Sequence, residues 1–396
     1  MNVRVWRRRT RAGLSQGSAV FIGAALGFGL TRIPSGPMIP TSSVTPMLLG
    51  VAVALLGTIA VVFSVLFLVV QWVATTFTPR LTLFRDAPIV WRTSGMAIGV
   101  IIFCITAALA AGGEPHVSVA VPTVATVLIL VLLAMLRSMH AQAFVAIQLS
   151  PVLASIAAHG RAILTATYEI DGASSAPAID DDSLPPKQVV VTWADPPAVL
   201  QRLHVHRLVR AARSAGAVIV VRVSGGTTVH EDMPIATVHG AGMDPATVRA
   251  GFVTGPERTF EQDPLLAFRL LADIGLRALS PAVNDPATAV QALDEIEYLM
   301  ARGMATSGRP REFADDDGVV RLVVGRPGWP EFLAAGVDDV MVAALPSPMV
   351  LSRLEILLTR LRDRALTRDQ RASLTRRLDW VRSERAMRFP ALLGPP

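Results

Sequence analysis

The sequence predicts an α-helical transmembrane bundle of about four spans, followed by a mixed α/β cytoplasmic domain with a small β half-barrel and a helical C-terminal part. The 396 residues are 52% hydrophobic, and the mean hydropathy of +0.48 is typical of membrane proteins. Long apolar stretches fill residues 18–139, whereas short β-like runs and amphipathic helical patterns fill the rest. The chain is therefore expected to have a membrane part and a water-soluble part.

Four apolar stretches approach or reach the roughly 20 residues that a helix needs to cross a bilayer. The first is short and follows a basic N-terminal segment, residues 1–17, as the apolar part of a signal peptide does. No small-residue cleavage site follows it, so we expect a retained helix. The expected spans of this transmembrane domain, residues 18–139, are residues 18–33, 47–73, 93–111 and 117–139.

Arginine is concentrated in the segments that are expected to lie in the cytoplasm. Residues 1–150 contain ten arginines and two acidic residues, and the connectors at 34–46 and 112–116 hold almost none of this positive charge. The positive-inside rule then places both termini on the cytoplasmic side of the plasma (inner) membrane. Residues 151–396 have almost no net charge, so the chain is not expected to bind nucleic acid. The expected partners are the lipid bilayer and further copies of the chain. No protein partner is predicted.

The expected spans contain no Asp, Glu, Lys or Arg in their cores. Proton relays and ion-coupled transporters usually need such groups, so these functions are disfavoured. Glycines repeat at a spacing of four, as Gly23/Gly27 in the first span and Gly95/Gly99 in the third. This spacing predicts close helix packing within one bundle.

The second span ends in a polar stripe. Gln71, Thr75 and Thr78 lie at positions i, i+4 and i+7 of the expected helix, so they share one face. Such a stripe either lines the mouth of a water-filled pore or marks the headgroup boundary, with Trp72 as an interfacial anchor. Both interpretations stay open from the sequence.

The expected water-soluble part has three sections. Residues 140–187 are expected to form a connector helix, interrupted by Pro151, and a linker rich in Ser, Ala, Pro and Asp. Residues 188–255 are expected to form a small β-rich subdomain with strands at 188–193, 217–223 and 235–238, a helix at 199–214 and a half-barrel around a double turn. Residues 256–396 are expected to be helical with one short strand, at 319–324, and the expected helices are residues 265–279, 285–302, 331–344, 348–365 and 368–388.

Two Asp-Pro pairs, at Asp263 and Asp285, predict helix starts, because aspartate is a good N-cap and proline suits the first helical position. The polar turn between the two helices is the best cluster for a site. The residues of this candidate polar hub are Arg258, Asp263, Asp273, Arg277, Ser280, Asn284 and Asp285.

A structural role of this hub is favoured over a ligand site. In that interpretation Asp285 caps a helix, Asn284 forms a turn and Arg277 pairs with Asp273. His204 and His206 would share a face only on a strand, and the helical pattern there predicts no metal site. No nucleotide-binding or catalytic motif occurs, Gly225-Gly226 alone is too common to count, and no cofactor is expected.

Three segments resemble the DUF2254 family of predicted bacterial membrane proteins. They are Arg258-Thr259 to Gln262-Asp263-Pro264, the run ADIGLRALSPAVNDPATAVQALDEI from Ala272 to Ile296, and VVFSVLFLVVQWVATTFTPRLTLF from Val61 to Phe84. The resemblance covers roughly residues 18–300. It implies the membrane architecture and brings no known activity or active site.

Three classes of function agree with these patterns. The first is an oligomeric pore or channel-like assembly with a cytoplasmic domain. The second is a membrane scaffold or sensor protein without pore activity. The third is an enzyme acting at the inner leaflet, which the sequence favours least because only the Asp/Asn/Arg turn offers chemistry.

Overall fold

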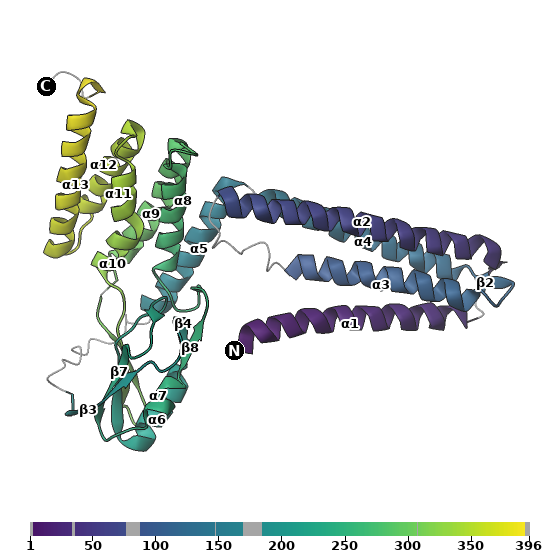
Figure 1. Cartoon of the computed structure of the whole chain (residues 1–396), viewed down its shortest axis with the longest axis horizontal. Coiled ribbons are helices and arrows are strands. Elements are labelled where there is room, and N and C mark those ends of the chain that lie inside the picture. Colours follow the sequence, from purple (N-terminus) through teal and green to yellow (C-terminus); the bar gives the residue numbers. More distant parts are fainter. Residues whose placement is uncertain are drawn as a thin grey trace. The chain divides into compact units, whose positions relative to one another are not determined.

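The computed structural model describes residues 3–33, 36–76, 88–146, 148–168, 184–306 and 308–392, with the backbone alone for residues 3–15, 69–70, 72–76, 88 and 146. The chain divides into two compact units, Val3–Pro151 and Val152–Pro396, called unit 1 and unit 2 below. Figure 1 shows long helices in unit 1 and a mixture of strands and helices in unit 2.

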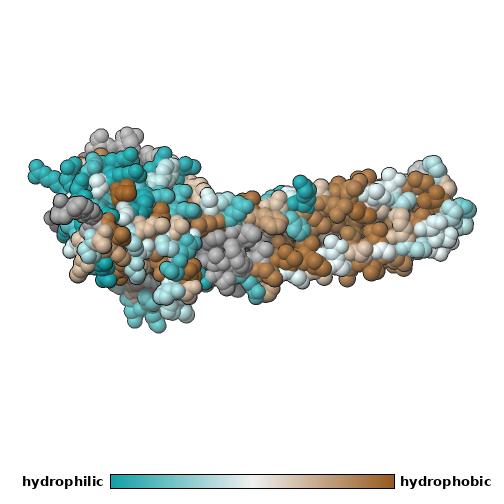
Figure 2. Space-filling model, turned by 90° about the horizontal axis from the view of Figure 1, so that it is seen from above, coloured by the Kyte–Doolittle hydropathy of each residue, from teal (hydrophilic) through white to brown (hydrophobic). Residues whose placement is uncertain are grey.

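Unit 1 is a bundle of four long helices: α1 (Val3–Thr31), α2 (Thr41–Thr76), α3 (Pro88–Ala111) and α4 (Ala120–Ala146). Helix α3 contacts each of the other three, and its Phe103 and Ala107 are fully buried. Outward-facing apolar side chains stay exposed, and Figure 2 shows them over the visible face of the bundle, in contrast to the mostly hydrophilic face of unit 2. Such a surface suits a lipid environment.

The two connectors at one end of the bundle pair with each other. Strand β1 (Met38–Pro40) precedes α2, and strand β2 (His116–Ser118) lies between α3 and α4. The two strands form a short antiparallel sheet in which Pro40 faces His116. The connector that follows α1 is therefore tied to the connector that follows α3.

Helix α1 approaches α3 closely because glycines lie at the contact. A Cβ atom at Gly23 would lie 2.3 Å from the carbonyl oxygen of Gly99, and one at Gly27 would lie 2.0 Å from Thr106 Oγ1 and 2.9 Å from the backbone nitrogen of Ala107. Any larger side chain at these two positions would have to push the helices apart. The close packing predicted from the Gly23/Gly27 spacing is confirmed, and Gly99 lies at the same contact.

Four helical segments are long and apolar enough to cross a membrane: Thr41–Leu68, Ile89–Ala111, Ala120–Val145 and Leu149–Tyr168. The first three correspond to expected spans. The expected span at 18–33 corresponds to a shorter apolar helix, Gln16–Thr31, and the fourth segment is the expected connector helix. The total of four agrees with the sequence, but one of its members differs.

The fourth segment, α5 (Leu149–Tyr168), uses its apolar face inside unit 2. Leu153, Ile156 and Leu164 are buried. Gly160 lets the helix approach two others, because a Cβ there would lie 2.5 Å from Ala267 Cβ and 3.0 Å from Leu299 Cδ1. The average hydropathy of α5 is high because this face belongs to the core of a folded unit. Its composition alone therefore does not make it a span.

Two sheets form the α/β part of unit 2. The five-stranded sheet has the order β3-β7-β5-β10-β9, in which β10 is parallel to β5 and the other pairs are antiparallel; the three-stranded antiparallel sheet has the order β6-β4-β8. Leu208 and Ala212 of α6 pack into a core that both sheets share. The elements are β3 (Lys187–Thr192), β4 (Ala198–Leu203), α6 (Val205–Ala215), β5 (Ala217–Val221), β6 (Thr228–Val229), β7 (Pro234–Gly240), α7 (Pro245–Arg249), β8 (Phe252–Gly255), β9 (Arg311–Ala314) and β10 (Val320–Val324).

The described residues contain no barrel, so the expected half-barrel is wrong. The expected strands at 217–223 and 235–238 do pair with each other, as β5 and β7, with Val221 opposite Ala236. Strand β6, which lies between them in the chain, instead pairs with β4 in the other sheet. The described part of residues 256–396 contains two strands, β9 and β10, where one was expected, and both join the five-stranded sheet.

The expected helix at 199–214 is divided between a strand and a helix. Strand β4 occupies its first part, and its pairing with β8 shifts register between Leu200 and Arg202. This irregularity interrupts the in-out alternation, so Leu200 and Leu203 are both buried at a spacing of three. A spacing of three also occurs on a buried helix face, which explains the wrong prediction.

The remaining helices pack beside α5 as a layer. They are α8 (Leu266–Ala278), α9 (Pro286–Gly303), α10 (Trp329–Leu333), the π-helical turn η3 (Ala334–Asp338), α11 (Asp339–Ala343), α12 (Pro348–Asp363), α13 (Arg368–Arg388) and the 3-10 turn η4 (Pro390–Leu392). Phe268 and Phe332 meet in its core with ring centroids 5.1 Å apart. The expected helices at 348–365 and 368–388 match α12 and α13, and the expected helix at 331–344 is interrupted by η3.

We expect Gly27→Leu to destabilise unit 1 by about 1–3 kcal/mol, because the new side chain overpacks the α1–α3 contact. The matched control is Gly29→Leu in the same helix, since a Cβ at Gly29 meets nothing within 4 Å. Thermal unfolding in detergent measures the difference. Equal melting temperatures for the two variants would contradict the packing described here.

Candidate functional site

The residues of the candidate polar hub lie in three groups along α8. Arg258 and Asp263 precede the start of the helix, Asp273 lies in its second half, and Arg277 to Asp285 lie at its end. With a rise of 1.5 Å per residue, the two ends of α8 are roughly 18 Å apart. The hub is therefore not a single site.

The first group is a buried ion pair. Arg258 Nε and Nη2 donate to the two carboxylate oxygens of Asp263 at 2.6 and 2.8 Å, and the Asp263 side chain is only 1% exposed. Asp263 Oδ1 also accepts a hydrogen bond from the backbone of Leu265 at 3.1 Å, just before α8 begins. The N-cap residue of α8 is Leu265, without a side-chain capping bond, so the helix start expected at Asp263 is wrong, and the main partner of Asp263 is the bidentate arginine.

A double-glycine turn lies directly against this ion pair. A Cβ atom at Gly226, where φ is +86°, would lie 2.2 Å from Asp263 Oδ2 and 2.7 Å from Arg258 Nε. A Cβ at Gly225 would lie 2.1 Å from the carbonyl oxygen of Gln262. Only glycine fits both positions. Sequence reasoning set this pair aside, and its position between two strands was the signal that could have indicated a close backbone approach.

The loop that contains Arg258 and Asp263 also forms hydrogen bonds with β4 of the three-stranded sheet. The Gln262 amide accepts from the backbone N–H of Leu203 at 2.9 Å and donates to the Leu203 carbonyl at 3.4 Å, at the end of β4. Gln201 donates to the carbonyl of Glu257 at 2.7 Å. The ring of Phe260 packs on the ring of His159 on α5, with the ring centroids 5.2 Å apart. Loop 257–263 is therefore the junction between β4, α5 and α8.

The second group contains a pair that differs from the expected one. Asp273 binds Arg269 at 2.8 Å, and Arg269 also binds Asp339 of α11 at 2.6 Å. The Nε atom of Arg277 is buried and has no hydrogen-bond partner among the described residues. The partner of Asp273 is thus Arg269, one turn before it on α8, and not Arg277, one turn after it, as the sequence analysis expected.

The third group is the turn between α8 and α9, which is built largely as expected. Asp285 caps α9 by accepting hydrogen bonds from the backbone and the hydroxyl of Thr288. These bonds, the hydroxyl bond first, lower the pKa of Asp285. Asn284 adopts a positive φ of +48°, and Ser280 donates to the Arg277 carbonyl at 2.7 Å. Residues 281–284 are exposed.

The other candidate residues do not form a site in the described part of the chain. Gln71 is exposed near the end of α2, whereas the Thr75 side chain and all of Thr78 lie outside the described residues. His204 and His206 are both exposed, on either side of the start of α6. Within the described residues no three or more His, Cys, Asp or Glu side chains gather where they could hold a metal ion.

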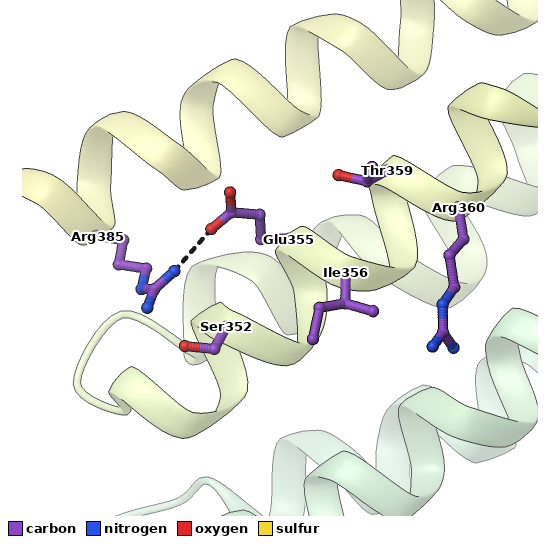
Figure 3. Close-up of a pocket in the computed structure, with 6 residues that line it drawn as sticks. All are labelled: Ser352, Glu355, Ile356, Thr359, Arg360 and Arg385. Carbon is purple, nitrogen blue, oxygen red and sulfur yellow. Dashed lines mark hydrogen bonds and ion pairs between the residues drawn. The ribbon is translucent and has the colours of Figure 1, made fainter. Parts of the chain in front are cut away.

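A shallow groove on α12 and α13 is a further surface feature, which the sequence did not predict. Figure 3 shows Glu355 of α12 and Arg385 of α13 pointing toward each other, whereas Ile356 and Arg360 of α12 point away from α13. Burial acts to raise the pKa of Glu355, but hydrogen bonds from Arg382 and Arg385 outweigh it and lower that pKa. The groove is lined by Ser352, Glu355, Ile356, Thr359, Arg360 and Arg385.

Ion pairs also join α12 to α9. Arg353 of α12 binds Asp294 at 2.6 Å and also binds Glu297. Asp294 of α9 therefore points to α12. These charged side chains bind one another, and their ion pairs join the described helices of the layer.

Apolar helices long enough to cross a bilayer, joined to a separate α/β and helical unit, define this chain as a predicted multi-helix membrane protein. The chain belongs to the DUF2254 family of predicted membrane proteins, whose model matches residues 15–360. The resemblance noted in the sequence is thus confirmed, and it extends beyond residue 300.

The relatives found are mycobacterial. Two uncharacterized proteins of Mycobacterium tuberculosis are 24% and 26% identical to this chain over 375 residues, and one of Mycobacterium bovis is 24% identical over the same length. Each alignment covers 87% of this chain and 70% of the relative. No solved structure matches this chain.

We expect Gly226→Ala to lower the stability of unit 2 by more than Gly318→Ala. Both glycines have a positive φ, +86° and +78°, so both variants carry a similar backbone cost of about 1 kcal/mol. A Cβ at Gly318 meets nothing within 4 Å, whereas one at Gly226 strikes the buried carboxylate. Denaturant unfolding of the full chain measures the difference. If the two variants unfold alike, the turn does not pack on the ion pair.

Proposed function

We propose that this chain is a membrane scaffold or sensor that presents the helical surface of unit 2 to a protein partner. The observation that carries this proposal is the groove on α12 and α13, which is open and shallow. Its exposed apolar side chain, Ile356, is flanked by Arg360, Glu355 and Arg385. Small-molecule sites are usually deep and enclosed, whereas an open apolar strip with a charged border suits a helix of another protein.

The polar clusters of unit 2 support the same choice over an enzyme. Asp263 is bound by Arg258 and Asp285 is bound by Thr288, so the oxygens of both carboxylates already have hydrogen-bond partners within the chain. Catalytic acids and bases are usually left with a free position toward substrate and a pKa near the working pH. The inner-leaflet enzyme therefore stays the third choice.

The topology that we propose has α1 to α4 crossing the inner membrane and both termini in the cytoplasm. The apolar face of α5 is occupied inside unit 2, which leaves four crossing helices and an even count. The arginine distribution supports the cytoplasmic side for the ends. Reporter fusions at Gly113 and Pro396 should report outside and inside respectively. An exported C-terminal reporter would contradict this topology.

We expect a photo-crosslinking amino acid at Ile356, in the full chain in cells, to give a discrete product with a different protein. The control position is Leu366, which is also exposed but lies in the loop between α12 and α13, away from the groove. Ile356→Arg should remove the interaction. Products at both positions, or at neither, would contradict the scaffold, and a product with a second copy of the chain would favour an oligomeric assembly.

A pore made by several copies is the second candidate, because Gln71 is exposed near the end of α2. Helix α3 fills the centre of one bundle, so a path would need an oligomer. Against a long aqueous path, the exposed hydroxyls of Thr58 and Ser64 bond to carbonyls of their own helix, as hydroxyls in lipid do.

We expect reconstituted full-length protein to show no ion flux under voltage or a salt gradient. Flux that falls in Gln71→Leu but persists in the control Thr58→Val would instead establish the pore and displace the scaffold. Gln71 lies at the end of the stripe that a pore mouth requires, whereas the Thr58 hydroxyl is already bonded to the Ala54 carbonyl.

A further inference from the structure

Exposed apolar side chains gather at one end of the helical layer of unit 2. Each belongs to the end of a helix or to a turn between helices, and each is about half exposed or more. They are Val283 (49%), Val342 (62%), Met349 (56%), Met387 (66%) and Leu392 (60%). The following contacts within unit 2 place them together; this set is called the apolar end below.

Helices α5 and α9 run in the same direction. Arg161 donates to the Tyr298 hydroxyl at 3.0 Å, so the middle of α5 meets the later part of α9. Further along, the Tyr168 ring lies 6.2 Å from the ring of Phe332, and Phe332 lies against Gly303 at the end of α9. The start of α5 therefore lies at the same end of the layer as the start of α9 and the turn that contains Val283.

Helices α12 and α13 place their apolar tips at this end as well. Gln370 donates to the Met304 carbonyl at 3.0 Å, which puts the start of α13 beside the end of α9. Arg385 binds Glu355 at 2.8 Å, so α13 runs antiparallel to α12. The end of α13, with Met387, and the start of α12, with Met349, thus lie on the side where α9 begins.

Helix α11 completes this end. Gly336 of η3 lies beside Phe268 of α8, and Val340 of α11 lies beside Gly275, so η3 and α11 run in the same direction as α8. Val342 therefore lies near the end of α8. Arg277 and Arg388 add positive charge here, although Arg388 also binds Glu384.

The chain itself connects this end to the membrane. Only residues 147 and 148 separate α4 from α5, and α4 contains a segment long enough to cross a bilayer. If α4 crosses, the start of α5 lies at the surface of that bilayer. The apolar end of the layer is the end where α5 starts, so it is the end of unit 2 that follows α4 most closely along the chain.

We infer that the apolar end of unit 2 rests on the headgroup region of the bilayer that α4 crosses. Apolar side chains inserted at the headgroup and acyl boundary gain from leaving water, and arginines at the same level suit anionic headgroups. This inference rests on the membrane crossing by α4, and it is independent of the scaffold proposal. Its occupant is a lipid surface, and the rival occupant is a second copy of the chain.

The test uses the full chain with Cys104→Ala and one added cysteine, Val283→Cys, Met387→Cys or the control Leu366→Cys. Leu366 is 67% exposed and lies at the opposite end of the layer. Each variant carries a fluorescent label and is reconstituted as a single copy in nanodiscs of zwitterionic and anionic lipid, with or without a quencher near the headgroup. We expect quenching at positions 283 and 387 and unchanged emission at position 366.

Unchanged emission at positions 283 and 387 would overturn the inference. Equal quenching at all three positions would also overturn it, because the contact would then not belong to one end. If emission at 283 and 387 changes only in nanodiscs that hold two copies, a second chain covers this end and the lipid contact is wrong. Replacing the anionic lipid with zwitterionic lipid should weaken the quenching, because the arginines lose their attraction.

Discussion

Unit 2 depends on the ion pair and hydrogen bonds of the buried Asp263 carboxylate. A charge that is 1% exposed is stable only if its oxygens are bonded, because removing a carboxylate from water costs several kcal/mol even after relaxation. Arg258 and the backbone of Leu265 supply those bonds. The ion pair also restricts the neighbouring chain, because the turn at Gly226 lies so close to the Arg258–Asp263 pair that a side chain does not fit there. The sheets, the loop 257–263 and the start of α8 are thus fixed relative to one another by one group.

Unit 1 is held by a different physical means. Lipid tails solvate apolar side chains well, so burial from water does not draw helices together within a bilayer. Contact area and the close approach of backbones do, and α1 gains both where Gly23 and Gly27 face α3. The two units therefore respond to different substitutions: added volume damages the bundle, whereas a lost charge partner damages the junction in unit 2.

Local signals predicted the elements that depend on local chemistry. The cap at Asp285, the turn at Asn284 and the whole of α13 follow from residues within a few positions of one another. The failures involve distant partners or an irregular strand. Strand β6 leaves the expected half-barrel because it pairs with β4, and the register shift in β4 imitates a helix. Arg269, not Arg277, binds Asp273. The spacing of four residues allowed either arginine, but Arg269 also binds Asp339 on a helix that is distant in the sequence.

The pairing of β1 with β2 has a consequence for biogenesis. The chain leaves the ribosome N-terminus first, so α1 and α2 are made before the strand that β1 requires, His116–Ser118. The glycine face of α1 likewise has to wait for α3. In the proposed topology the first helical hairpin therefore enters the bilayer without its final contacts. Assembly of the bundle is then complete only when the third and fourth helices have been made.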